Sequence, residues 1–303
     1  MTATLERDRT TPPPSPPRRA DGYWSRIAWT ATPLLVVALF AVYPLIRVLL
    51  SSTEGAGTSS WSGVLGSEIF RTALMRTAQI AICSTAGCLV LGTFVAVVLA
   101  FVPFPGSRVV ARLIDTVLAL PSFLITLAFT FLYGTAGALN ALMMEITGRD
   151  TALVDFLNTP AGVIAAEITF FTPFVVRPLL AAFALVSREQ LDVAASLGAS
   201  PWRVLRTVVM PEAWPALMAG GSLVLLLTLN EFGIVLFTGA KDVVTLPVLI
   251  YTRGIVTFDL PGAAVIGTVQ VVLSLTLYLT YRLIFARLLS GRKGQPDVVV
   301  DKP

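Results

Sequence analysis

Residues 79–101 read QIAICSTAGCLVLGTFVAVVLAF, an apolar stretch without a single charged side chain. A helix needs about 20 such residues to cross the hydrocarbon core of a bilayer, because each residue adds about 1.5 Å along the axis. Comparable stretches recur along the chain, so the sequence predicts an all-α polytopic membrane protein with six transmembrane helices. We place these spans near residues 29–50, 79–101, 113–133, 161–186, 214–238 and 262–286.

The composition supports a membrane protein and argues against several other classes. Hydrophobic residues make up 55% of the chain and charged residues 13%, against about 25% charged residues in soluble domains. The net charge is +4, but the basic residues are scattered, without the basic and aromatic stripe of a nucleic-acid site. There is no His and no GxxxxGK[ST] stretch, so we expect no catalytic centre, no metal site and no ATP site in this chain.

The two ends of the chain are polar. Residues 1–26 include TTPPPSPPRR and are predicted to form a disordered cytoplasmic tail, which is too long and polar to begin a cleavable signal peptide. The six-helix domain is expected over 27–290 and a C-terminal tail over 291–303. With both termini in the cytoplasm, 15 of the 22 Lys and Arg residues fall on the cytoplasmic side, as the positive-inside rule requires.

The polar segment 187–211, between the fourth and fifth predicted spans, carries the signals of two capped helices. Ser187 can cap the first helix in a box with Gln190, and Gly198 suits the left-handed residue at its end. Ser200 can cap the second helix with Pro201 at its first position. We expect this second helix to stop before Pro211, because proline cannot donate the next hydrogen bond.

The second of these helices is amphipathic. Trp202, Leu205 and Val209 share one face at spacings of three and four, and Arg203 and Arg206 share another. Such a helix pair could be a connector that lies in the lipid headgroups, or it could be a docking element for a cytoplasmic partner. Periodicity does not separate these two interpretations.

The same segment resembles the signature of a known family, the inner-membrane permease subunits of binding-protein-dependent ABC importers. Their EAA motif has Glu-Ala-Ala followed by a spaced Gly and a Pro. Asp192, Val193 and Ala194 stand at the first three positions, Gly198 at the Gly and Pro211 at the Pro. Asp192 shortens the arm of the family's Glu, and Val193 adds bulk where the family has Ala. The resemblance covers the second to sixth spans and their loops.

The resemblance implies a partner for each side of the membrane. In the family, this loop docks into a groove on a cytoplasmic ABC ATPase dimer, which binds the ATP and pushes on the spans. Ser200, Pro201, Trp202, Arg203 and Arg206 would belong to that contact. A binding protein outside the inner membrane delivers the solute, and a second permease chain, identical or different, completes the path within the lipid.

Asp115, Glu167, Arg177 and Glu231 are ionisable residues inside the predicted spans, where such groups are costly and are functional candidates by default. Asp115 and Arg177 lie at matched depth with opposite sign, and we predict that they pair, the alternative being that each reaches its own interface. Glu167 and Glu231 lie nearer the outside. Together with Asn230, all four ionisable residues are candidates for the translocation path, although a structural hydrogen-bonding role is about equally expected for Asn230 and Glu231.

Further resemblances bear on the transported solute. The stretch around Glu231, LTLNEFGIVLF, resembles the EFG stretch of sulfate, molybdate and phosphonate permeases, and the loop after residue 237 resembles that of 2-aminoethylphosphonate permeases. The cargo expected from the resemblance is therefore 2-aminoethylphosphonate or a related phosphonate, with sulfate, molybdate, ferric iron, thiamine and polyamines as alternatives. A secondary transporter or channel acting alone is the alternative from another class, but it would need internal repeats, and none is evident.

Overall fold

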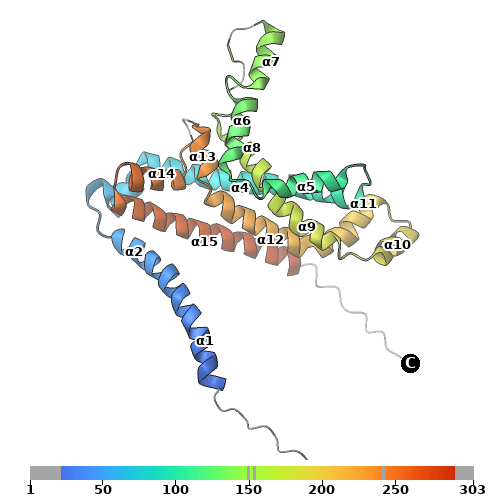
Figure 1. Cartoon of the computed structure of the whole chain (residues 1–303), viewed down its shortest axis with the longest axis horizontal. Coiled ribbons are helices and arrows are strands. Elements are labelled where there is room, and N and C mark those ends of the chain that lie inside the picture. Colours follow the sequence, from blue (N-terminus) through green and yellow to red (C-terminus); the bar gives the residue numbers. More distant parts are fainter. Residues whose placement is uncertain (1–21, 149–150, 153–154, 241–242, 291–303) are drawn as a thin grey trace, which may run out of the picture. The chain divides into compact units, whose positions relative to one another are not determined.

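The computed structural model describes residues 22–148, 151–152, 155–240 and 243–290, and these ranges are built from helices and connecting turns (Figure 1). The predicted all-α class is confirmed, because six helical segments are long and apolar enough to cross a membrane. These spans are Trp29–Ser51, Glu68–Phe101, Phe123–Thr147, Pro160–Phe183, Pro201–Leu229 and Leu260–Arg287.

The chain divides into two units at Arg47. In the first unit, α1 (Gly22–Val37) and the π-turn η1 (Ala38–Val42) run into α2 (Tyr43–Ser51), whose residues from Val48 onward are counted in the second unit. Helix α1 begins inside the predicted tail, whose residues 1–21 lie outside the described residues, as does the predicted tail 291–303. The second unit contains η2 (Gly57–Ser59), α3 (Trp61–Gly66), α4 (Glu68–Phe101), α5 (Ser107–Val117), α6 (Phe123–Tyr133), α7 (Ala138–Thr147), α8 (Pro160–Phe171), α9 (Pro173–Phe183), α10 (Arg188–Ser196), α11 (Pro201–Val204), η3 (Leu205–Val209), α12 (Met210–Leu229), α13 (Gly233–Thr238), α14 (Leu246–Tyr251), η4 (Thr252–Val256) and α15 (Leu260–Ser290).

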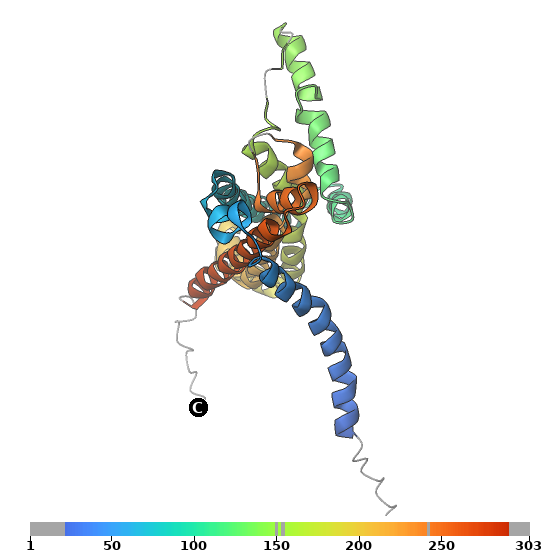
Figure 2. The ribbon, with the colours of Figure 1, turned by 90° about the vertical axis from the view of Figure 1, so that its left-hand side faces the viewer.

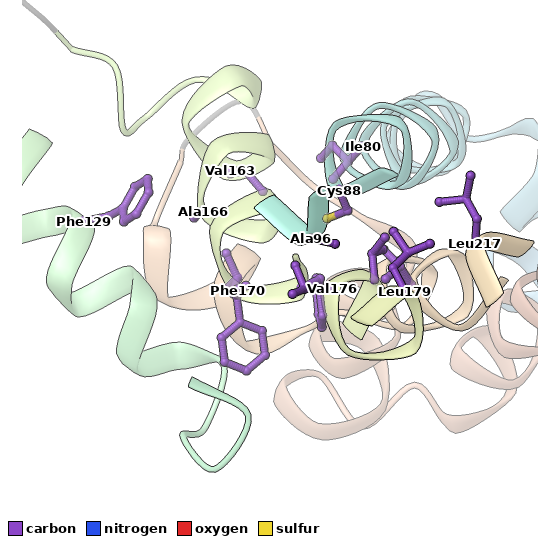
Figure 3. Close-up of a cluster of buried hydrophobic side chains, with 14 of the residues drawn as sticks. Ile80, Cys88, Ala96, Phe129, Val163, Ala166, Phe170, Val176, Leu179 and Leu217 are labelled. Atoms are coloured by element: carbon purple, nitrogen blue, oxygen red, sulfur yellow. The ribbon is translucent and has the colours of Figure 1, made fainter. Parts of the chain in front are cut away.

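The main core of the second unit lies where α4, α8, α9 and α12 pack together. Figure 3 shows Ile80, Cys88 and Ala96 of α4 facing Val176 and Leu179 of α9. Small side chains allow this close approach: a Cβ on Gly92 would lie 2.8 Å from the Cβ of Val175. Packing through small residues is what holds helices together where lipid, rather than water, surrounds them.

The third predicted span is wrong in its bounds. Residues 107–117 form the separate helix α5, and the candidate span starts at Phe123 and continues through α7 to Thr147. The break falls at 118–122, around Pro121, whose ring and missing N–H interrupt a helix. Helices α6 and α7 project from the layer formed by α4, α12 and α15 (Figures 1 and 2).

Three other spans also depart from what the sequence predicts. The second begins at Glu68 rather than at residue 79. In the fourth, the chain breaks between α8 and α9 at Thr172, just before Pro173, whereas Pro178 lies inside α9 without ending it. The fifth span ends at Leu229, so the predicted segment 214–238 covers two helices, α12 and α13. Figure 1 shows α12 and α15 running side by side.

Candidate functional site

The segment 187–211 begins with the predicted cap. The Ser187 Oγ accepts a hydrogen bond from the Gln190 backbone N–H at 3.3 Å, and α10 follows directly. The reciprocal bond from the Gln190 side chain to the Ser187 N–H is not among the hydrogen bonds of the described residues. One of the two bonds of a capping box is therefore formed.

The end of α10 is closed by a left-handed residue, as predicted. Gly198 has φ +78°, and its N–H bonds to the Ala195 carbonyl at 2.9 Å while the Ala199 N–H bonds to the Ala194 carbonyl at 3.1 Å. These two bonds form a Schellman motif, which satisfies carbonyls at the helix end. A Cβ on Gly198 would meet nothing within 4 Å, so the backbone conformation alone favours glycine here.

The second helix does not stop at Pro211, contrary to the prediction. The Ser200 Oγ caps α11 by accepting from the Arg203 N–H at 3.4 Å, and Pro201 takes the first helical position. The chain then passes through the π-turn η3 into α12, with Pro211 in the first turn of α12. This π-turn, which is wider than an α-helical turn, lies just before Pro211, whose nitrogen has no hydrogen to donate. The described segment from Pro201 to Leu229 is one continuous helical rod.

Six of the predicted loop residues, Asp192, Val193, Ala194, Pro201, Trp202 and Pro211, line two hollows. An open groove of about 1020 Å³ separates α10 from the start of the rod, and its lining includes Val193, Ala194 and Pro211. A second hollow of about 550 Å³ lies between the rod and the end of α4, with Asp192 and Trp202 in its lining. Asp192 and Val193 are both exposed, so neither departure from the EAA motif is packed into the core of this chain.

Large apolar side chains in this segment remain exposed. Trp202 is 69% exposed and Leu197 83% exposed. Arg203 and Arg206 are exposed beside them. Exposed apolar residues gathered with arginines are typical of a surface that another protein or a membrane covers.

The predicted pairing of Asp115 with Arg177 is present in the structure. The Arg177 guanidinium forms an ion pair with the Asp115 carboxylate, and both side chains are partly exposed. Asp115 lies in α5 rather than inside a transmembrane span, because α5 ends before the third span begins. The ion pair fastens this amphipathic helix to α9.

Glu167 and Glu231 have different surroundings. Glu167, on α8, is fully buried, and neither carboxyl oxygen has a hydrogen-bond donor in bonding geometry among the described residues. Glu231 lies in the break after α12, where its Oε1 accepts from the Ser122 hydroxyl at 3.0 Å and from the Ile234 N–H at 2.8 Å. Glu231 therefore links the break between α12 and α13 to the break before α6.

Asn230 ends α12, and the structure adds a polar partner that the sequence interpretation missed. The Asn230 side-chain amide donates to the Leu226 carbonyl at 2.7 Å. Gln270, inside α15, donates to the Leu229 carbonyl at 2.6 Å and is 6% exposed. The signal that could have revealed Gln270 is its amide within an otherwise apolar span.

Six candidate spans, with a capped helix pair whose second member continues into the fifth span, fit the class that the resemblance suggested, the permeases of ABC importers. Residues 88–290 match the family described as the binding-protein-dependent transport system inner membrane component. The chain belongs to this family. It is the permease subunit of an ABC importer, a transport component of the inner membrane rather than an enzyme, which sets aside the alternative of a transporter acting alone.

Named relatives fall into two groups by similarity. A Salmonella paratyphi A protein named 2-aminoethylphosphonate transport system permease protein PhnU is 48% identical over 89% of this chain and 94% of its own length. The Salmonella typhimurium protein of the same name is 49% identical over 86% of this chain and 93% of its own. A sulfate transport system permease protein, cysT, of Chlorokybus atmophyticus is 34% identical over 66% of this chain and 68% of its own.

Solved structures share the fold at low identity. A chain of a bacterial alginate ABC transporter, in complex with its alginate-bound periplasmic protein, aligns with a TM-score of 0.75 at 18% identity, covering 88% of this chain and 95% of that chain. A chain of the MetNI methionine ABC transporter aligns with a TM-score of 0.52 at 19% identity, covering 74% of this chain and 95% of that chain.

Proposed function

We propose that this chain forms the path by which 2-aminoethylphosphonate, or a related phosphonate, crosses the inner membrane. The observation that carries the proposal is the 48% identity, spread over 89% of the chain, to a permease named for that solute. Similarity to the sulfate permease cysT is lower and covers less of the chain, so sulfate is the second candidate. Molybdate, ferric iron, thiamine and polyamines remain alternatives to be included in a substrate screen.

The helix pair α10–α11 is the proposed docking element for a cytoplasmic ABC ATPase dimer. Its exposed apolar residues, with Arg203 and Arg206, suit a protein groove. A stiff element attached to a moving span is required if ATP-driven motion is to reach the path. The continuous helix from Pro201 to Leu229 supports this role. The groove lined by Val193, Ala194 and Pro211 lies at the joint between α10 and the rod.

The remaining parts of the proposed assembly follow from the family. A solute-binding protein outside the inner membrane would deliver the phosphonate, and a second permease chain would complete the path within the lipid. The charge distribution supports cytoplasmic termini, which would place α10 and α11 on the side of the ATPase.

The five polar residues that are candidates for the translocation path have different proposed roles. Asn230 and Glu231 lie in the break between α12 and α13, directly after the fifth span, where polar groups can meet a solute. Asp115 and Arg177 are proposed to brace α5 against α9 at the cytoplasmic end of the path. Glu167 is enclosed by this chain, so it would reach a solute only after the helices around it move.

Uptake by cells tests the proposed cargo. A strain that lacks its own phosphonate importers would receive this chain together with its ATPase and binding protein. We expect uptake of radiolabelled 2-aminoethylphosphonate that excess unlabelled 2-aminoethylphosphonate abolishes and excess sulfate does not. Uptake of labelled sulfate instead would keep the importer and overturn the phosphonate assignment.

A further inference from the structure

A small pocket lies where α12 ends and α14 and α15 pass beside it. Its volume is about 290 Å³, and its lining residues are Asn230, Phe232, Pro247, Ile250, Tyr251 and Gln270. None of these side chains carries a charge, so the pocket is suited to a small ligand held by oriented polar atoms and ring faces.

Both amide side chains of the pocket donate to backbone carbonyls, and no hydrogen bond from a described residue reaches either amide oxygen. A backbone carbonyl only accepts, so the bonds from Asn230 to the Leu226 carbonyl and from Gln270 to the Leu229 carbonyl must use the NH₂ groups. The Gln270 Oε1 is buried, and no donor in the described part of the chain reaches it. A buried acceptor without a partner is costly, and a donor entering the pocket would remove that cost.

Two aromatic rings and the end of α12 also make the pocket favourable for a positively charged ligand. The rings of Phe232 and Tyr251 lie 5.0 Å apart between centroids at an interplanar angle of 53°, and ring faces attract organic cations. The pocket adjoins the carbonyl end of the 20-residue helix α12, which carries partial negative charge. Glu231 lies in the same break and forms no salt bridge with a cation among the described residues.

From these features we infer that the pocket at Asn230, Tyr251 and Gln270 binds a primary ammonium group. An ammonium carries three N–H donors and no acceptor, which complements unused amide oxygens and ring faces. The pocket suits a phosphonate poorly, because no cationic side chain lies in its lining to pair with a doubly charged anion. The inference rests on the proposed function in one respect: the ammonium would be the amino end of 2-aminoethylphosphonate, with the phosphonate directed away from the pocket.

Direct binding to the permease complex tests this assignment without the solute-binding protein. The complex of permease and ATPase would be reconstituted in nanodiscs, and saturation-transfer NMR would measure binding of ethylammonium and, separately, of ethylphosphonate. We expect binding of ethylammonium and none of ethylphosphonate. Equal binding of both, binding of ethylphosphonate alone, or displacement of ethylammonium by equimolar sodium would overturn the assignment.

Substitutions locate the binding in the pocket. Gln270→Met keeps the side-chain length but removes the acceptor, and we expect about a tenfold or greater rise in the dissociation constant, as loss of a hydrogen bond to a charged group implies. Tyr251→Leu, which leaves the amide bonds to α12 intact, should weaken binding in the same direction if Gln270→Met fails to fold. Gln79→Met, on α4 outside the pocket, is the control and should bind as the unsubstituted complex does. Unchanged affinity in Tyr251→Leu and in any folded Gln270→Met would overturn the pocket assignment.

The binding experiment on the pocket and the uptake experiment on the proposed cargo can fail independently of each other. If the complex binds ethylammonium in the pocket but cells take up no 2-aminoethylphosphonate, the cargo is another amine and the proposed function fails. If cells take up 2-aminoethylphosphonate while the pocket variants bind ethylammonium normally, the cargo stands and the pocket assignment fails.

Discussion

At the scale of single residues, a few positions in the loop 187–211 and at the helix breaks set the local geometry. Gly198 adopts the left-handed conformation at the end of α10. A Cβ there would meet no neighbouring atom, so glycine is favoured by its backbone conformation and not by lack of space. Glu231 bonds to two groups across a gap between helices. The glycine was predictable from its position after a polar helix. The partner of Glu231 was not, because Ser122 is 109 positions away in the sequence.

Gly198→Val should uncouple ATP hydrolysis from transport without preventing membrane insertion. A branched residue in the left-handed region costs about 1–2 kcal/mol, and the turn would relax toward another geometry that misplaces α11. ATP hydrolysis and solute uptake measured on the same membranes would show this as retained hydrolysis with reduced uptake. Gly66→Val is the matched control, because Gly66 has no positive φ and open space around it; normal uptake in Gly198→Val would contradict the role of the turn.

The ion pair between Asp115 and Arg177 should respond to charge exchange. Asp115→Arg and Arg177→Asp should each reduce uptake, and the double exchange should restore most of it, because the two charges would again attract. Both groups are partly exposed, so the effect on stability should stay below about 1 kcal/mol. Arg112→Asp on the same helix, where no salt bridge is formed among the described residues, is the control. A double exchange no better than either single substitution would argue against the pair.

At the scale of elements, apolar length predicted the number of spans well and their limits poorly. The six runs of apolar residues specify six spans because the bilayer sets their length. The third span was misplaced, since residues 113–117 run directly into the apolar stretch that follows but belong to the separate helix α5. The fifth span was expected to begin after Pro211, because proline usually ends a helix. Its actual start depends on a π-turn, which no local sequence signal identifies.

Pro211→Ala tests the part that this π-turn plays. Alanine would restore the donor missing at 211, so η3 could close into an ordinary α-helix and rotate α11 by roughly a quarter of a turn against α12. We expect substrate-dependent ATP hydrolysis to fall several-fold. Pulsed electron-spin distances between labels on α11 and α4 should change. Pro215→Ala, within α12 and beyond the turn, should leave both measurements as they are; an unaltered distance in Pro211→Ala would mean that the π-turn does not depend on the proline.

At the scale of the whole molecule, the assignment as an ABC importer permease follows from the family match over residues 88–290, and the fold agrees with solved transporters. The helix pair and its Gly–Pro spacing were readable from sequence because capping is local. The pocket at Asn230 and Gln270 was not, because it joins α12, α14 and α15, which only tertiary packing brings together.

The proposed orientation makes a topological prediction. In a variant without Cys83 and Cys88, a cysteine in place of exposed Glu54 should react with a membrane-impermeant maleimide on intact spheroplasts. A cysteine in place of exposed Leu197 should react only after the membrane is opened, because α10 is proposed to lie in the cytoplasm. The opposite pattern of labelling would reverse the orientation and remove α10 from the side of the ATPase.

The most direct test of the central claim is transport by purified components. The permease, its ATPase and its binding protein would be reconstituted into liposomes, with ATP supplied on the ATPase side and labelled 2-aminoethylphosphonate on the other. The account predicts ATP-dependent accumulation of the solute that is lost in Gly198→Val and retained in Gly66→Val. Accumulation without the ATPase, or ATP-driven transport of sulfate but not of 2-aminoethylphosphonate, would contradict it.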